Sequence, residues 1–467
     1  MTARAQCNSE RDHRLHVAAC AVRGEKEAHV ASILTHVLAN ARISAAAPTP
    51  LTGAQIRGFW AAWGGWALDG MDSFIYALVL TPALTELLPK SGIPATPGNV
   101  GVYGSVLFAL FLIGWGLSMV WGPIADRFGR VRTLALTILC YSAFTFAAAL
   151  ATNVWHLAAF RLLAGIGIGG EWAIGGTYVA ESWPEDRRRM GAGYLHTGYY
   201  FGFFLAAIAN YFIGARYGWR WMFAIGGTPA LLVTFIQYAV SESAAWQKHD
   251  RRRPTMRAAF AKLFSPQYVR RTWLNAIYLL VSIVGLWAGS VYVPTSVTQI
   301  AVRDGRSLAD AARLASYGTM VLSAGTIAGC LVLPILADRY GRRLTLGFYF
   351  AIMLASIAVG FGYVFYLPHA LAPFMLVLFA LGVGGANFAM YTLWLPEQYA
   401  TDCRASAFAF ATSVGRFAGA GITFLVGAGV QHFHTIGMPV ALTSLAFAVG
   451  LVLLPFGEET QGKPLPA

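Results

Sequence analysis

Charged residues are scarce in this chain, and their scarcity excludes an ordinary soluble protein. Only 12% of the 467 residues are Asp, Glu, Lys or Arg, whereas 57% are apolar, and the mean hydropathy is +0.56. A soluble domain carries about 25% charged residues. The composition therefore predicts a membrane protein.

Cysteine pairs and catalytic motifs are also lacking. The five cysteines form no CxxC pair, which argues against a disulfide framework and against a metal site. The sequence shows no nucleophile elbow, phosphate-binding loop or metal-binding motif. We therefore expect the protein to be no enzyme and to hold no metal or organic cofactor.

Long apolar runs are abundant, and polar or charged breaks separate them. Windows of about 20 residues, long enough to cross a hydrocarbon core of about 30 Å, indicate twelve spans. Because lipid leaves no other partner for the backbone, each span is predicted to be a helix. The spans lie near residues 58–86, 101–122, 133–151, 155–179, 190–214, 220–240, 272–298, 312–335, 344–366, 371–393, 407–430 and 437–456.

The formal net charge of +13 is distributed as a topology signal. Of the 34 Lys and Arg residues, 26 lie in the two tails and the even-numbered breaks. This positive-inside bias predicts a multi-pass protein of the cell (inner or plasma) membrane with both termini in the cytoplasm. Nucleic-acid binding is a remote alternative, because the basic residues form no single patch.

The breaks divide the chain into five predicted parts. The longest internal break is basic and separates six spans from six. We expect a cytoplasmic tail over 1–57, a six-helix bundle over 58–240, a cytoplasmic loop over 241–271, a second six-helix bundle over 272–456 and a cytoplasmic tail over 457–467.

Three patterns recur between the two halves at nearly one offset. Asp126-Arg-Phe-Gly-Arg130 returns as Asp338-Arg-Tyr-Gly-Arg342, and Gly167-Ile-Gly-Gly170 returns as Gly382-Val-Gly-Gly385. The pair Glu181 and Arg188 returns as Glu397 and Arg404. Three matches at nearly one offset predict a duplicated six-helix unit.

These motifs carry a family resemblance over roughly residues 58–456. Gly122-Pro-Ile-Ala-Asp-Arg-Phe-Gly-Arg130 resembles the cytoplasmic loop motif of the major facilitator superfamily. Arg161, followed by Gly165, Gly167, Gly169 and Glu181, is similar to the fourth-helix pattern of its sugar and organic-acid branches. Pro334 departs from the pattern, because the second loop motif would have a glycine there. The resemblance implies an all-helical fold of two six-helix bundles.

Two acid-carrying branches are most similar. Leu68-Asp-Gly-Met-Asp72 and Val414-Gly-Arg416 resemble the aromatic-acid/proton symporters, and Thr177 to Pro184 resembles the sialic-acid/proton symporters. Both branches import carboxylates with protons. The resemblance therefore implies proton-coupled symport of an organic acid, and it does not identify the acid.

Five ionisable residues lie within the predicted spans, where each costs about 2.5–3.5 kcal/mol at the centre of an isolated helix. With a rise of about 1.5 Å per residue, Asp72 in the first span and Arg161 in the fourth lie at similar depths. A carboxylate beside a guanidinium stays ionised, and separation from it in a dry cavity favours protonation. We therefore predict that Asp72 carries the proton and that Arg161 controls its charge; a static salt bridge is the alternative.

Asp69 and Glu171 are the other buried carboxylates. Asp69 lies one turn below Asp72 on the same helical face and could relay or share the proton, or be a hydrated cavity residue. Glu171 lies about 15 Å from Arg161 along the same helix. It could provide the inner proton exit, or make a structural contact at a helix end.

Arg416 lies about ten residues into the eleventh span, and the other spans of its half contain no acidic residue. A buried cation without a partner favours an anion, and the planar guanidinium matches a carboxylate in two bonds. We predict that Arg416 anchors the substrate carboxylate; a backbone carbonyl is the alternative partner. Aromatic and amide side chains are predicted to complete the site, although packing alone could explain each of them: Trp66, Tyr76, Trp172, Tyr199, Tyr200, Trp287, Asn387 and Tyr391.

The charged residues of the repeated motifs lie at predicted cytoplasmic helix ends. The resemblance implies ion-pair networks that close an inner gate, while the arginines also fit the positive-inside bias alone. These residues are Asp126, Arg127, Arg130, Glu181, Arg188, Asp338, Arg339, Arg342, Glu397 and Arg404.

Together the residues predict a secondary transporter whose halves rock around a central site. We expect a small organic acid and protons as its transported partners, a lipid bilayer around it and function as a monomer. A carrier of a neutral solute such as a sugar, or an exporter of drugs or metabolites, is the alternative within transport. A membrane receptor or nutrient sensor is the alternative from another class.

Overall fold

A computed structural model describes residues 49–466, apart from 232, 234–239, 243–245, 247–254, 291 and 434. Residues 51–467 form one compact unit, and all regular elements in its described part are helices. The greater part of the predicted N-terminal tail, residues 1–48, lies outside the described residues.

The first half follows the predicted order of spans. Its main helices are α2 (Gly53–Lys90), α3 (Pro97–Leu117), α4 (Trp121–Phe128), α5 (Arg130–Ala149), α6 (Val154–Ser182), α7 (Arg188–Ala209) and α9 (Trp219–Gly226). Short polar side chains start several of them: Thr52 accepts from the Gln55 N–H, and Asn153 from the His156 N–H. Such N-caps satisfy backbone donors that the first helical turn leaves free.

The second half repeats this arrangement with more breaks. Its helices are α12 (Met256–Lys262), α13 (Val269–Ser290), α14 (Val293–Arg303), α15 (Leu308–Gly362), α16 (Leu371–Gly385), α17 (Asn387–Trp394), α18 (Arg404–Phe433), α19 (Gly437–Leu442) and α20 (Leu445–Leu453). The predicted tenth span is broken between α16 and α17, directly after Gly384 and Gly385, whereas the matching Gly169 and Gly170 lie within the unbroken helix α6. Helix α12 lies within the predicted central loop and was not foreseen.

Gly129 and Gly341 form matching sharp turns in the two repeated loop motifs. Gly129 separates α4 from α5 with φ 114°, and Gly341 interrupts α15 with φ 81°. Residues with a side chain rarely adopt this positive-φ backbone conformation, so the motif requires glycine at both positions. Helix α15 therefore contains the predicted eighth and ninth spans, which explains its length of 55 residues.

Length and composition alone identify fewer spans than the repeat pattern does. Among the described residues, six segments are long and apolar enough to cross a membrane, or seven if the bent helix α2 is included. The segment Arg313–Tyr366 is one of the six, although it contains two passes on either side of Gly341.

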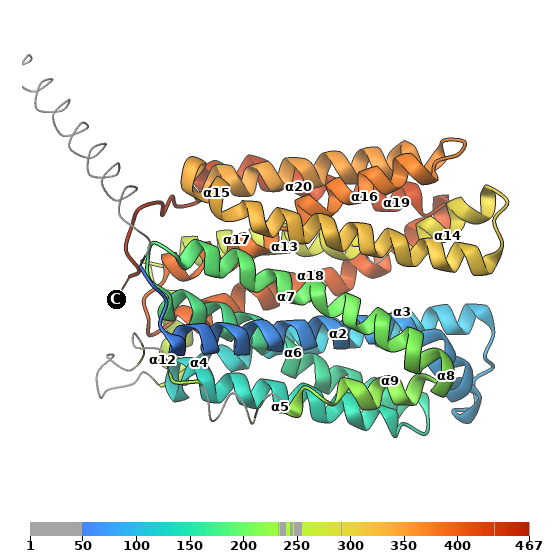
Figure 1. Ribbon diagram of the computed structural model, residues 1–467, viewed down its shortest axis with the longest axis horizontal. Coiled ribbons are helices and arrows are strands. Elements are labelled where there is room, and N and C mark those ends of the chain that lie inside the picture. The colour runs from blue at the N-terminus through green and yellow to red at the C-terminus, as the bar shows by residue number, and fades with distance from the viewer. Residues whose placement is uncertain are drawn as a thin grey trace, which may run out of the picture. The chain divides into compact units, whose positions relative to one another are not determined.

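The two halves meet along α3 and α7 of the first and α15 and α18 of the second, and these helices run roughly side by side (Figure 1). Gly193 on α7 makes close packing feasible. A methyl group there would lie 2.6 Å from the Cys330 carbonyl oxygen and 3.1 Å from Pro334 on α15. Pro334, which departs from the loop motif, is thus part of the contact between the halves.

Candidate functional site

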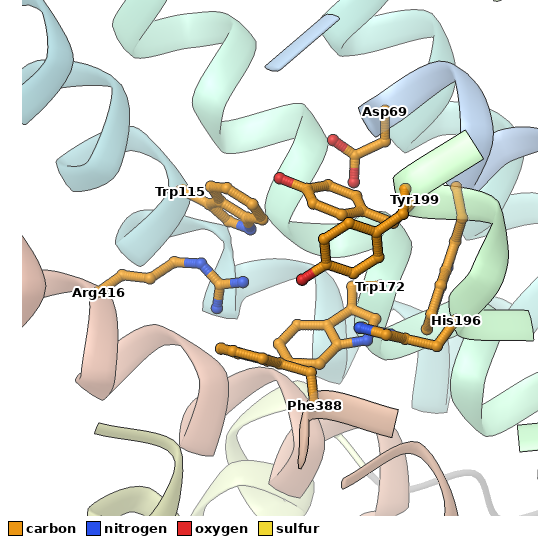
Figure 2. Close-up of a pocket in the computed structure, with 9 residues that line it drawn as sticks. Asp69, Trp115, Trp172, His196, Tyr199, Phe388 and Arg416 are labelled. Carbon is orange, nitrogen blue, oxygen red and sulfur yellow. The ribbon is translucent and has the colours of Figure 1, made fainter. Parts of the chain in front are cut away.

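A small cavity of about 30 Å³ lies between the halves, near the middle of the long helices. It is lined by Trp66, Asp69, Trp115, Trp172, His196, Tyr199, Tyr200, Phe388 and Arg416, which are drawn as sticks in Figure 2, most of them labelled. Arg416 reaches the cavity from the second half and Asp69 from the first, so the site needs both halves. We call this cavity the central pocket.

Arg416 enters the central pocket from α18 and is almost fully buried. Its guanidinium lies over the Trp115 ring at 3.9 Å and near the Trp172 ring at 5.2 Å. Nη1 donates to the Thr412 carbonyl at 2.7 Å, whereas Nε has no hydrogen-bond partner among the described residues. Aromatic faces and one carbonyl thus hold the cation, and no described carboxylate forms an ion pair with it.

Asp69 projects from α2 into the same pocket as Arg416. Its carboxylate accepts a hydrogen bond from the Ser73 hydroxyl at 3.4 Å. From the sequence, Asp69 is predicted to relay a proton or to be a hydrated cavity residue, and Arg416 is predicted to anchor the substrate. The structure puts both residues in one cavity.

Asp72 and Arg161 make their predicted contact one turn away from the pocket. Arg161 Nη1 lies 3.5 Å from Asp72 Oδ2, and both side chains are fully buried. The guanidinium of Arg161 lies between the rings of Tyr76, at 4.5 Å, and Phe111, at 4.4 Å. Asp72 Oδ1 and Arg161 Nη2 have no hydrogen-bond partner in the described part of the chain, so the pair is close but incompletely bonded.

Glu171 lies on α6, apart from Arg161, as its position in the sequence indicated. Its carboxylate occupies space left by Gly65 on α2, where a methyl group would come within 1.8 Å of Oε1. Neither oxygen has a hydrogen-bond partner among the described residues, although Asp69 and Tyr141 are its titratable neighbours. Glu171 is therefore a buried carboxylate beside the helix that carries both aspartates.

Only some of the predicted aromatic and amide residues lie at the central pocket. Trp66, Trp172, Tyr199 and Tyr200 line the central pocket, whereas Tyr76 packs on Arg161. Two more lie elsewhere in the second half. Asn387 donates to the Gly384 carbonyl, and Tyr391 bonds Ser282 and the Tyr278 carbonyl. The side chain of Trp287 lies outside the described residues.

Trp115, His196 and Phe388 line the pocket but were missed by the sequence analysis. Trp115 and Phe388 are apolar residues in apolar spans and carry no local signal. His196 did carry one, because a histidine within a predicted span is itself a polar residue in lipid.

Gate residues of the first half form a network that joins the two halves. Arg130 donates to Glu181 at 3.0 and 3.2 Å and to the Thr401 carbonyl at 2.8 Å, and Arg404 donates to Glu181 at 2.8 Å. Asp126 accepts from the Ser406 N–H and hydroxyl at 2.9 and 2.5 Å. Glu181 thus binds one arginine from each half. We call this end of the helix bundle the motif end.

The matching network of the second half is also at the motif end. Arg342 donates to Glu397 at 2.7 and 2.9 Å, and Arg189 of the first half forms an ion pair with Asp338. Arg188 donates to the Ala180 carbonyl. Arg127 and Arg339 are exposed and lie beside the rings of their chain neighbours Phe128 and Tyr340.

Lys262 on α12 ties the central segment to the turn before α18. Its ammonium donates to both oxygens of Asp402 at 2.6 and 2.8 Å. Burial is the largest single effect and disfavours the charge of Lys262, but the hydrogen bond to Asp402 and the negative charge of that carboxylate act together to raise the lysine pKa. The segment that connects the two halves is thus held at the motif end by this ion pair.

Two further carboxylates at the motif end were missed. Glu242 accepts from the N–H groups of Arg130 and Val131 at the start of α5, and Glu459 accepts from those of Arg342 and Arg343 after Gly341. Each carboxylate caps the helix that follows a motif glycine, where it also opposes the positive end of the helix dipole. Each follows the last span of its half, which extends the internal repeat.

A second cavity of about 240 Å³ lies at the other end of the pocket helices. Phe74 and Phe203 line it from the first half, and Pro294 and Met320 from the second. The rings of Phe74 and Phe203 stack at 4.8 Å, and Phe203 also contacts Tyr199 of the central pocket at 5.1 Å. This pair of rings lies between the two cavities.

Comparisons with known proteins agree with this architecture. The model of the Major Facilitator Superfamily matches residues 62–424. The chain is 32% identical over 422 residues to a probable 4-methylmuconolactone transporter of Cupriavidus pinatubonensis, covering 87% of this chain and 91% of the relative. It is 30% identical over 442 residues to the niacin transporter NiaP of Acinetobacter baylyi, covering 87% and 94%.

Solved structures show the same fold. The proton:xylose symporter XylE, from E. coli, superposes with a TM-score of 0.71 at 19% identity, covering 88% of this chain and 98% of XylE. The predicted all-helical fold of twelve spans in two six-helix bundles is confirmed. With the family match and the relatives named as transporters, the chain belongs to the major facilitator superfamily and is a multi-pass membrane transporter, not an enzyme.

Proposed function

We propose that this protein imports a ring-bearing carboxylic acid together with a proton across the cytoplasmic membrane. The observation that carries the proposal is Arg416, a buried cation that faces an aromatic pocket between the halves and forms no ion pair with a described carboxylate. An anionic ligand would supply the missing partner.

The contacts of Arg416 support a carboxylate in particular. A buried guanidinium without a counter-ion is costly, and its fork of donors matches two carboxylate oxygens. The Trp115 ring covers one face of the Arg416 guanidinium, and the Thr412 carbonyl accepts a hydrogen bond from Nη1. Nε has no partner among the described residues. A substrate carboxylate would use the donors that remain.

The aromatic lining supports a ring on the substrate. Six of the nine pocket residues are Trp, Tyr or Phe, and aromatic walls favour flat, partly apolar ligands. The two relatives above carry in their names 4-methylmuconolactone and niacin. At about 30 Å³, the pocket must widen before a ring can enter.

The count of buried charges supports proton coupling. Asp69, Asp72 and Glu171 are three carboxylates in one region, and Arg161 and Arg416 are the two guanidiniums beside them. With all five ionised, the group would carry one net negative charge. One bound proton neutralises it, and a bound substrate anion would require one proton more, because uncompensated charge in lipid is costly.

The gate and the second cavity support alternating access. The halves are joined at the motif end through Glu181, Arg130 and Arg404, while the larger cavity lies at the other end. The positive-inside bias assigns the motif end to the cytoplasm. The structure would then be the state that is closed to the cytoplasm. In this proposal a proton is the coupling ion, and both termini of the chain lie in the cytoplasm.

Arg416→Lys tests the proposal in purified protein reconstituted into proteoliposomes. Uptake of labelled benzoates, small hydroxy acids and sugar acids is measured with and without an inward proton gradient. We expect a ring-bearing acid to accumulate with the gradient, and Arg416→Lys to raise its KM by at least about tenfold, because lysine cannot make two parallel bonds.

Arg220→Lys is the matched control, because Arg220 binds Glu86 by two hydrogen bonds at a helix end outside the pocket. It should leave the KM unchanged. Accumulation of a neutral sugar without any acid, or an unchanged KM for every acid in Arg416→Lys, would refute the proposal.

A further inference from the structure

Among the ring nitrogens of the central pocket that have no hydrogen-bond partner in the described part of the chain are Nδ1 of His196 and Nε1 of Trp172, and both residues are about 95% buried. Nε1 of Trp66 is another, but it lies against Gly175 of α6, where a methyl group would come within 2.9 Å of it. Leaving a buried polar group unpaired costs about 1–3 kcal/mol. A pair of such groups that line one cavity therefore points to a ligand that would satisfy them.

Ring packing holds His196 in place without using this nitrogen. The imidazole stacks on Phe388, with ring centroids 6.1 Å apart and an interplanar angle of 2°. It meets Trp66 edge to face at 5.4 Å and Tyr200 at 6.0 Å. The imidazole is thus oriented by apolar contacts from α2, α7 and α17, which leave Nδ1 available to a ligand.

His196 lies across the pocket from the carboxylate anchor, and Trp172 lies between the two, with its ring 5.2 Å from the Arg416 guanidinium and 6.2 Å from the His196 ring. Figure 2 shows His196 entering the pocket from the side opposite Arg416, with the nitrogen-bearing edge of Trp172 beside it. The indole N–H can only donate a hydrogen bond, whereas a neutral imidazole has one donor and one acceptor nitrogen. A hydroxyl oxygen can satisfy both residues, and a carbonyl oxygen can accept from either.

We propose that His196 and Trp172 form a second polar subsite, and that the substrate is a cyclic carboxylic acid with a hydroxyl or carbonyl oxygen at the end of its ring opposite the carboxylate. This inference rests on the proposed function, because it takes Arg416 as the carboxylate anchor. The two subsites read opposite ends of one ring, and the aromatic walls hold the ring between them.

Calorimetric titration of the purified protein with matched acids tests the subsite. The pairs are benzoate with 4-hydroxybenzoate, and cyclohexanecarboxylate with 4-oxocyclohexanecarboxylate. We expect the oxygen-bearing acid of at least one pair to bind about tenfold or more tightly, the ratio that about 1.4 kcal/mol produces. His196→Phe and Trp172→Phe keep a ring and remove the nitrogen, and should reduce the ratio to about threefold or less.

Trp121→Phe is the matched control. Trp121 donates its indole N–H to the Ile166 carbonyl at 2.8 Å and does not line the pocket, so this variant should keep the wild-type ratio. Thermal melting of each variant verifies folding, and either of the two pocket variants suffices if the other fails to fold.

Each outcome decides the inference. Equal binding within both acid pairs, or ratios that the two pocket variants leave unchanged, overturns the second subsite while the carboxylate anchor stands. Binding of none of the four acids overturns the proposed function and the subsite with it.

Discussion

Arg161 and Arg416 show how this protein holds cations within a bilayer. Each guanidinium lies against two aromatic rings: Arg161 against Tyr76 and Phe111, and Arg416 against Trp115 and Trp172. Such contacts are worth about 2 kcal/mol or more when desolvated. They lower the cost of burial without neutralising the charge, so both cations can still attract a carboxylate.

Asp72→Asn is expected to uncouple transport from the proton gradient. The amide cannot take up a proton, yet it has nearly the same shape and can remain beside Arg161. Accumulation driven by an inward proton gradient should fall by at least about tenfold, as expected when a buried group at a coupling site loses its charge. Exchange of labelled for unlabelled substrate should persist, and both are measured in proteoliposomes.

Glu86→Gln is the control for this substitution. Glu86 lies on the same helix, α2, but pairs with Lys90 and Arg220 at its exposed end, so gradient-driven uptake should be unchanged. If Asp72→Asn keeps its accumulation while Asp69→Asn loses it, the proton carrier is Asp69 and the assignment to Asp72 is wrong.

At the scale of elements, the two motif glycines combine a turn with a helix cap. A methyl group at Gly341 would lie 2.8 Å from the Glu459 carboxylate, and one at Gly129 would lie 2.4 Å from that of Glu242. Each glycine therefore serves twice: it allows the positive φ angle, and it admits the carboxylate that caps the next helix.

Gly341→Ala is expected to destabilise the protein more than Gly92→Ala does. Both glycines have positive φ angles, 81° and 73°, so each alanine carries strain of about 1–3 kcal/mol. Only at Gly341 does the new methyl group displace a cap, worth about 1 kcal/mol more; Gly92 has open space around it. Thermal melting in detergent measures the difference, and equal shifts would contradict the capping role of Glu459.

Glu181→Gln is expected to loosen the motif end. Glu181 binds Arg130 and Arg404 from different halves, and breaking a buried ion pair costs about 3–5 kcal/mol. Opening there should expose the buried thiol of Cys403, which is next to Arg404. Its labelling by a maleimide, followed by mass spectrometry, should accelerate by at least about tenfold.

Glu458→Gln is the control at the same end, because Glu458 pairs with Arg271 and Lys463 within the second half. It should not change the labelling of Cys403. Equal labelling rates in Glu181→Gln and the unmodified protein would show that this ion pair does not hold the halves together.

At the scale of the whole molecule, each half supplies part of one site. The first half carries Asp69, Asp72, Glu171 and Arg161, and the second carries Arg416. Because Asp69 and Arg416 face one pocket, the proposed binding of a substrate carboxylate at Arg416 would change the charge that Asp69 experiences. Proton and substrate would then influence each other without a long-range pathway.

The charge count predicts electroneutral transport of a monovalent acid. One anion and one proton carry no net charge, so uptake should respond to a pH gradient and not to membrane potential. Proteoliposomes with potassium gradients and valinomycin separate these two driving forces. Uptake driven by an inside-negative potential at equal pH would require at least two protons per anion.

The sequence by itself determined the twelve spans, the duplicated halves and the residues whose burial needs a reason. Hydropathy, charge bias and motif spacing are local properties, and the membrane leaves few alternatives for an apolar run. The turn at Gly341 and the shared depth of Asp72 and Arg161 follow from such local rules. The break after Gly385 and the helix α12 within the predicted central loop did not follow from such local rules, because both depend on packing against other helices.

Only the tertiary structure decided which side chains share the pocket. It placed Tyr76 on Arg161, removed Asn387 and Tyr391 from the pocket, and brought Trp115, His196 and Phe388 into it. It also placed Asp69 with Arg416, which are 347 positions apart in the chain. The rotation and axial offset of helices from different halves arise from close packing over their whole length, and no local pattern encodes them.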